Sequence, residues 1–329
     1  MFMKKLFFTL FFSILSVVST HAQEWMDAWT DQHWTNGWQM MSSLRINKSQ
    51  VVLNCTYAIG EEYYYLFEVK DLGNGNYDMK SISPSQITTP KQKINPEVRN
   101  VIDREEYTDP EGMIWKRRKI GGQDVLVRYY ANNTVNTAFL STGREASEVM
   151  NDDLMEIICG KYTTAKGVKF EFKNDGTCIF NGKVTSYSMA NQGEYGSPSL
   201  HIRVNDELYE VEPTTEGMTI YPTSIPAGST ETVTGNKPYA QLIASKDAPR
   251  WEFLSWRICC DGAFGLLNKN LLQLMRNEIF ATKGYKFSDA KLRSYFESCK
   301  WYKPAKDNNA VKLNDIELFH VSLLKEHEK

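Results

Sequence analysis

Residues that commonly carry out catalysis are scarce in this sequence. Histidine occurs only five times in 329 residues. The chain has no H-E-x-x-H, no G-x-S-x-G and no Walker loop, the motifs that identify many zinc proteases, α/β-hydrolases and P-loop nucleotidases. None of its six cysteines is spaced as C-x-x-C, which argues against a zinc ribbon or a redox motif. We therefore predict no metal site, no cofactor and a function that is not enzymatic.

One catalytic arrangement stays open as a lesser alternative, in which a histidine activates a cysteine thiol. His201 and either Cys159 or Cys178 belong to the same part of the chain. An imidazole within hydrogen-bond reach of a thiol can make it a nucleophile. Nothing in the spacing of these residues brings them together, so a hydrolase has little support.

The cysteines are too few for a disulfide scaffold in a chain of this length. They are Cys55, Cys159, Cys178, Cys259, Cys260 and Cys299. An even number in an exported protein permits bridges, and six cysteines allow about fifteen pairings. We interpret them mainly as small buried hydrophobic residues, with a single bridge as the alternative. The adjacent Cys259 and Cys260 would need separate partners, because a bond between neighbours is strained.

Long hydrophobic runs are absent except at the N-terminus. Lys4 and Lys5 precede an apolar run at residues 6–18, and the small residues Thr20 and Ala22 precede a cleavage point before Gln23. This layout is typical of a signal peptide, which we place at residues 1–22. The run is too short for a transmembrane helix. We expect an exported, soluble chain in the periplasm or outside the cell, with no transmembrane segment after cleavage.

The chain has no large excess of charge, since 38 basic residues face 40 acidic ones. This balance makes nucleic acid a poor partner. Basic side chains nevertheless concentrate near the C-terminus, where we select six as candidate binding residues: Lys283, Lys286, Lys291, Arg293, Lys300 and Lys303. Such a cluster suits an anionic polymer or an acidic partner of the cell envelope. The alternative is a solvated face that packs against the acidic part of the same chain.

Residues 23–143 are predicted to form a β-rich domain. Apolar and aromatic residues alternate with polar ones from residue 44 onward, and glycine-rich turns at 73–76 and 121–122 join strands. Four tryptophans precede this pattern, and we expect them to anchor a core or a domain contact, although Trp25 and Trp29 could share a helical face. We expect residues 83–110 to be a long loop, with one helical turn as the alternative. A calcium loop at residues 71–78 is a weak alternative to a simple hairpin.

A helix and a second β domain follow. Residues 144–160 have the apolar spacing of a linking helix, on which Asp152, Asp153 and Glu156 are expected to form a solvated face. Residues 161–248 contain about eight short segments with strand-forming patterns and hairpin turns, which predict a small lipocalin-like β-barrel. Its interior could hold an apolar ligand. The preferred alternative is an interior filled by Phe170, Phe172, Phe180 and Tyr187.

Residues 249–329 are predicted to form a helical domain. Apolar residues recur at helical spacing before Gly284, again after Ser288, and from Asp315 onward, which indicates three helices. Ser288 is expected to cap the second of them. Trp251, Phe253 and Trp256 are expected to dock this domain on the barrel. The fold class is therefore α+β: two mainly antiparallel β domains, each a small barrel or sandwich, followed by a three-helix module.

The helical stretch resembles the YARHG domain, a bacterial extracellular module of about this size. The run Arg276–Ile279 reads R-N-E-I, and the name motif follows as F-A-T-K-G at residues 280–284, with its Tyr, Arg and His replaced. The framework residues that match the family pattern are Arg276, Asn277, Glu278, Gly284, Tyr285, Phe287, Trp301 and Tyr302. The resemblance implies a cell-envelope location and an interaction with the wall or with a partner. It assigns no binding role to Thr282 or Lys283.

Together these observations predict an exported, non-enzymatic binding protein of the bacterial cell envelope. Its C-terminal module would engage a wall component or an envelope partner. The alternative function is a small-ligand carrier that uses the barrel.

Overall fold

The structure is a computed structural model. It describes residues 25–29, 34–35, 37, 40–47, 50–56, 62–88, 90–94, 96–105, 107–108, 114–130, 132–190, 199–229 and 232–329. The predicted signal peptide and Trp38 lie outside these ranges. No helix within them is both long and apolar enough to span a bilayer.

The first β unit is an antiparallel meander. Its strands are β1 (Trp25–Trp29), β2 (Trp34–Thr35), β3 (Met40–Asn47), β4 (Gln50–Thr56), β5 (Glu62–Gly73), β6 (Asn76–Ser81), β7 (Tyr107–Thr108), β8 (Ile114–Ile120), β9 (Gln123–Tyr129) and β10 (Val135–Ser141). Strands from β3 to β10 pair with their neighbours in sequence, apart from β7, which adds to β5 in parallel. The two-residue strand β2 pairs with both β10 and β3, so the sheet closes on itself.

Two of the expectations for this unit were wrong in detail. Trp25 and Trp29 lie in strand β1, which pairs with β3, and not on a helix. The stretch predicted as a loop contains two 3-10 turns, η1 (Pro84–Gln86) and η2 (Lys91–Lys93), and the helix α2 (Pro96–Asp103). This helix forms because it can bury Val98 against Leu66 and Ile82. Its local sequence is polar and does not predict these contacts.

The predicted turn at residues 73–76 is a hairpin between β5 and β6. Asn74 and Gly75 both have positive φ, at 55° and 75°, which is the conformation that a two-residue hairpin turn requires. Asp71 Oδ1 accepts the Gly73 N–H at 2.7 Å, so this carboxylate stabilises the turn. The geometry matches the simple hairpin that we preferred over a calcium loop.

The second β unit is a closed barrel that follows helix α3 (Ala146–Ile158). Its strands are β11 (Gly160–Thr163), β12 (Lys169–Phe172), β13 (Thr177–Phe180), β14 (Lys183–Met189), β15 (Leu200–Val204), β16 (Glu207–Pro213), β17 (Gly217–Ser224), β18 (Val233–Thr234) and β19 (Ala240–Ala244). All pairings are antiparallel, and β11 closes the ring by pairing with β19, while β18 lies outside the ring on β17. The barrel that the sequence predicted is therefore present.

The interior of this barrel is packed with its own aromatic side chains. Phe170, Phe172, Phe180 and Tyr187 are all buried. The centroids of the Phe172 and Tyr187 rings lie 5.2 Å apart, and those of Phe170 and Phe180 lie 5.3 Å apart. Edge-to-face contacts of this kind add to the stability that burial provides. These contacts favour the side-chain-filled interior over the ligand-binding one.

The C-terminal part is helical, as the fold class predicted. It contains η3 (Glu252–Ser255), α4 (Asp261–Phe264), α5 (Lys269–Thr282), α6 (Ala290–Glu297), η4 (Asn308–Ala310) and α7 (Asp315–His327). The three longer helices are those that the periodicity indicated. Helix α6 is capped by Asp289, not by Ser288, because the Asp289 carboxylate accepts the Leu292 N–H at 2.9 Å.

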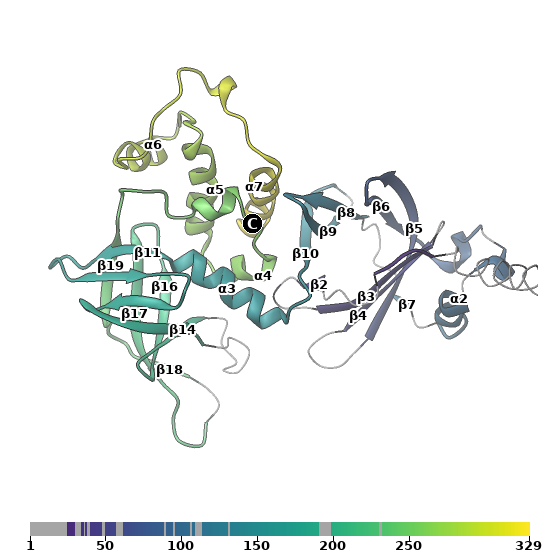
Figure 1. The fold of residues 1–329 in the computed structure, drawn as a ribbon, viewed down its shortest axis with the longest axis horizontal. Helices are drawn as coiled ribbons and strands as arrows, with labels where there is room; N and C mark the ends of the chain where they lie inside the picture. The colour runs from purple at the N-terminus through teal and green to yellow at the C-terminus, as the bar shows by residue number, and fades with distance from the viewer. Residues whose placement is uncertain are drawn as a thin grey trace, which may run out of the picture.

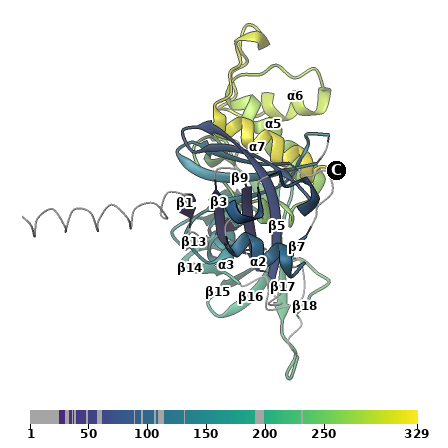
Figure 2. The same cartoon turned by 90° about the vertical axis from the view of Figure 1, so that its right-hand side faces the viewer.

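The helices lie above α3 and the second barrel, and α4 and α7 are next to the first β unit (Figures 1 and 2). One continuous core joins α3, the second barrel, the helices and several residues of β9 and β10. Contact with the first unit also involves glycines. A Cβ atom on Gly121 would lie 2.5 Å from Ile316 of α7, and one on Gly37 would lie 2.9 Å from Cys260 Sγ. The helical part thus packs against both β units.

Candidate functional site

The six candidate basic residues do not form one uniform surface. Lys283 forms an ion pair of 2.8 Å with Glu317, whose side chain is fully buried at the start of α7. Lys300 forms an exposed pair of 2.7 Å with Asp247, which follows the second barrel. Lys286 Nζ donates to Lys306 O. Among the described residues, Lys291, Arg293 and Lys303 are exposed and have no carboxylate partner.

Two segments of the helical region, residues 284–286 and residues 303–308, lie side by side and are joined by hydrogen bonds. Ala305 N–H donates to Gly284 O at 2.7 Å, and Asn308 bonds both the N–H and the C=O of Lys286. Gly284 has φ of 81°, and a Cβ there would lie 2.7 Å from Lys303 O, so this position requires glycine. Helix α6 lies on the opposite side of α5 from the first sheet (Figure 1). Lys291 and Arg293 therefore belong to a helix on the outer part of the helical region.

The framework residues hold the helices together. Arg276 pairs with Glu328 through two contacts of 2.5 and 3.0 Å. Asn277 Nδ2 donates to Gln273 O within α5. Tyr285, Phe287, Phe296, Trp301 and Tyr302 form a connected cluster of rings. These contacts are structural, and none of them leaves a polar group aimed at a ligand.

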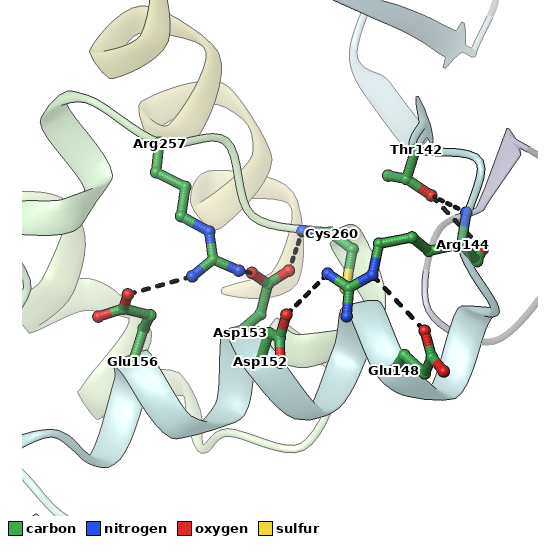
Figure 3. A network of polar contacts seen from close by, with 8 residues as sticks. All are labelled: Thr142, Arg144, Glu148, Asp152, Asp153, Glu156, Arg257 and Cys260. Atoms are coloured by element: carbon green, nitrogen blue, oxygen red, sulfur yellow. Dashed lines mark hydrogen bonds and ion pairs between the residues drawn. The ribbon is translucent and has the colours of Figure 1, made fainter. Parts of the chain in front are cut away.

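A polar network joins α3 to the segment that precedes α4, and sequence reasoning missed it (Figure 3). Asp153 is fully buried and pairs with Arg257, and its second oxygen accepts the Cys260 N–H at 2.7 Å. Arg257 also bonds Glu156 at 3.1 Å. Burial raises the pKa of Asp153 to about 6, although the Arg257 charge lowers it. The expectation of a solvated face was therefore wrong for Asp153 and Glu156 and holds only for exposed Asp152.

The helical spacing carried a signal for this burial. Asp153 lies four residues after Val149 and four before Ile157, which places it on the apolar stripe of α3. Its partner could not be read from the sequence, because Arg257 is 104 residues away.

A second buried contact links the helices to the first sheet. Thr137 on β10 donates its hydroxyl to Asp261 at the start of α4. The other oxygen of Asp261 lies 2.6 Å from His327 Nε2, near the end of α7. One carboxylate thus connects the sheet to two helices.

His320 is a structural histidine with both ring nitrogens bonded. Its Nδ1 lies 2.8 Å from Leu254 O, and its Nε2 lies 3.1 Å from the Cys259 nitrogen. A carbonyl only accepts and an amide N–H only donates, so the ring is neutral with its proton on Nδ1. Burial lowers the pKa of His320 to about 4, which agrees with this assignment.

The thiols show no sign of activation. The five cysteines whose side chains are described, all except Cys55, are free. Burial raises the pKa of Cys159 to about 12 and that of Cys178 to about 11. His201 Nδ1 lies near Ser199 O, at 3.2 Å. A reactive thiol needs a lowered pKa, so the burial of Cys159 and Cys178 argues against a role for them as nucleophiles.

Trp251 and Phe253 are buried where the helices meet α3 and the barrel, as the docking prediction required, but Trp256 is 61% exposed and does not take part. Trp251 Nε1 donates to Ile157 O of α3 at 3.2 Å. A cavity of about 300 Å³ lies close by, between barrel strands β11, β12 and β19 and the segment that follows β19, and is lined by charges of both signs: Lys161, Glu171, Asp247 and Arg250. No group of described His, Cys, Asp or Glu side chains is arranged to hold a metal ion.

Comparison with known proteins identifies one region. Residues 261–329 match the family model of the YARHG domain. The chain therefore carries this domain at its C-terminus, within the stretch that the sequence pattern indicated, and the domain is typical of exported proteins. No curated protein and no solved structure matches the chain.

Proposed function

We propose that this protein is a non-enzymatic binding protein of the bacterial cell envelope, and that its YARHG domain engages an anionic wall polymer through its outer basic face. The observation that carries the proposal is the group Lys291, Arg293 and Lys303. These side chains are exposed and have no carboxylate partner within the described part of the chain. Exposed cations without acidic partners attract polyanions and steer their association.

Two features support a role for this face over a purely structural one. Lys291 and Arg293 sit on α6, and Lys303 belongs to a segment held to residues 284–286 by the Ala305 N–H and by the Asn308 side chain, so the fold fixes the main chain that carries these cations. Lys283 and Lys300 are occupied by Glu317 and Asp247, which reduces the candidate binding residues to the outer ones. The match to a domain typical of exported proteins supports a location in which wall polymers occur.

The test is sedimentation of the full chain with purified bacterial walls that carry anionic glycopolymers, at about 50 mM and about 300 mM salt. We expect retention at low salt and a several-fold loss at the higher salt. A Lys291→Glu/Arg293→Glu/Lys303→Glu variant should lose retention at both. If the native protein does not sediment with the walls even at the lower salt concentration, the proposal is wrong.

The matched control changes the same total charge elsewhere. Lys166, Lys173 and Lys183 are exposed on the turns and edges of the second barrel. A Lys166→Glu/Lys173→Glu/Lys183→Glu variant should keep most of its retention. If both triple variants lose binding equally, the attraction depends on net charge and not on the basic face.

A further inference from the structure

Residues 251–260, here called the strap, connect the second barrel to the matched YARHG domain. The strap contains only the short 3-10 helix η3, so regular structure satisfies few of its main-chain groups. It is nevertheless deeply buried: Trp251, Leu254 and Cys259 are each at most 2% exposed. A buried irregular peptide needs outside partners for its N–H and C=O groups. In this protein, side chains provide them.

The first set of hydrogen bonds to the strap comes from α5 and from the residue that caps α7. Glu278, on the R-N-E-I run of α5, accepts the Trp251 N–H at 2.7 Å. Asn314 donates its Nδ2 to Ser255 O at 2.9 Å, while its Oδ1 accepts the Glu317 N–H. Both side chains belong to the YARHG domain, and both bond the strap's main chain rather than its side chains.

The second set of hydrogen bonds to the strap comes from the middle of α7. His320 donates to Leu254 O and accepts from the Cys259 N–H, so one ring holds two points of the strap five residues apart. Three side chains of the domain thus bond four main-chain groups of one peptide. Main-chain hydrogen bonds combined with pockets for apolar side chains are a general way in which proteins bind peptides.

The strap also contributes apolar anchors. Trp251, Phe253, Leu254 and Ile258 are buried and belong to the same core as Leu272 and other residues of α5 and α7. On its other side the strap contacts α3, through Arg257 with Asp153 and through the Trp251 indole. It therefore lies between α3 and the domain and touches both.

We propose that α5 and α7 of the YARHG domain form a peptide-binding groove, which the strap fills in cis. The ligand is a peptide with large apolar anchors that presents N–H and C=O groups at the spacing of Trp251, Leu254, Ser255 and Cys259. This groove uses Glu278, Asn314 and His320, and none of the basic residues of the outer face. It also does not involve Thr282 or Lys283, where the name motif is altered.

The first experiment is native-state hydrogen exchange on the unmodified full chain. A bound segment opens separately from its receptor, because local openings need less free energy than global unfolding. The Trp251 and Cys259 amides should therefore exchange at least about tenfold faster than amides in the middle of α5 and α7. If these amides exchange only together with α5 and α7, the strap is part of one cooperative core and the proposal is wrong.

The second experiment supplies the strap as a separate peptide. A full-length Trp251→Ser/Leu254→Ser variant weakens the cis strap, and a reduced synthetic peptide of residues 249–260 is added to it. We expect saturable binding and a rise in Tm. The same peptide with both serine changes should not bind, and neither should the native peptide when His320→Ala is added to the variant. Absence of binding by the native peptide, or equal binding by both peptides, contradicts the proposal. If the variant does not fold, the exchange experiment decides alone.

Discussion

At the scale of single residues, buried ionisable groups are the most informative features. Glu278, His320 and Asp153 each lie in a helix, and each accepts a hydrogen bond from a main-chain N–H of the strap. Burial raises the pKa of Glu278 to about 7, despite the hydrogen bond from Trp251 that lowers it. Residues that might suggest catalysis are explained by this structural role. Their titration should then appear in stability rather than in activity.

The first prediction concerns the pH dependence that Glu278 creates. Its pKa in the folded state exceeds the ordinary value of 4.5, so the folded protein holds this proton more tightly than the unfolded chain. Stability from this group is present at low pH and is lost as the pH rises from about 4.5 through about 7. Relative to Glu278→Gln, the native protein should lose roughly 2–3 kcal/mol between pH 5 and pH 8. Urea unfolding at intervals of one pH unit measures this difference.

The comparison with Glu278→Gln is needed because other buried groups titrate nearby. His320 has a lowered pKa, so its contribution changes in the opposite sense and is lost as the pH falls from about 6.5 towards 4. Subtracting the variant removes the contributions that both proteins share. Parallel stability profiles for the two proteins would contradict the assigned burial of Glu278.

At the scale of elements, α3 carries two kinds of ion pair on one helix (Figure 3). Arg257 pairs with fully buried Asp153, whereas Arg144 pairs with Asp152 and Glu148, which are both exposed. Exposed pairs contribute little, because water and salt screen them. Removing one partner of a buried pair leaves a charge without compensation. The two arginines therefore provide a matched comparison.

We predict that Arg257→Met destabilises the protein by about 2–4 kcal/mol, since it leaves the Asp153 carboxylate buried and unpaired. Arg144→Met should cost less than about 0.5 kcal/mol. Adding Asp153→Asn to Arg257→Met should recover part of the loss. Chemical unfolding of the four proteins at neutral pH gives these values, and equal effects of the two arginine substitutions would show that α3 does not hold the strap.

At the scale of the whole molecule, the YARHG domain contacts both β units. Asn268, the N-cap of α5, donates its Nδ2 to Pro213 O on strand β16 of the second barrel at 3.3 Å. On the other side, Asp261 bonds Thr137 of the first sheet. The domain thus has an inner surface committed to its own chain and an outer basic face for the proposed partner. Its sequence boundaries alone do not reveal this division.

The glycines of the β8–β9 turn test the contact with the first sheet. Both have positive φ, so alanine strains the backbone at either position. A Cβ on Gly121 also meets Ile316 of α7, whereas a Cβ on Gly122 meets nothing within 4 Å. We expect Gly121→Ala to destabilise the protein by about 1 kcal/mol more than Gly122→Ala. Thermal unfolding measures the difference, and equal effects would indicate that this turn does not pack on α7.

Much of the architecture follows from local sequence. Period-two alternation and glycine-containing turns fix strands and hairpins, and short connections then require antiparallel neighbours. Apolar spacing and a glycine at position 284 define α5 in the same local way. The R-N-E-I run and the aromatic framework were sufficient to locate the YARHG domain.

Tertiary structure decided which polar residues are buried and with what they pair. Asp153 and Arg257 are separated by 104 residues, and Thr137 and Asp261 by 124, so no local pattern links them. Burial strengthens such contacts because it removes water that would otherwise compete for the same groups. The sequence by itself thus determined the elements and the domain type. Only the folded chain decided that Lys283 and Lys300 have carboxylate partners, that Lys291, Arg293 and Lys303 are exposed without one among the described residues, and that the strap lies between α3 and the helices.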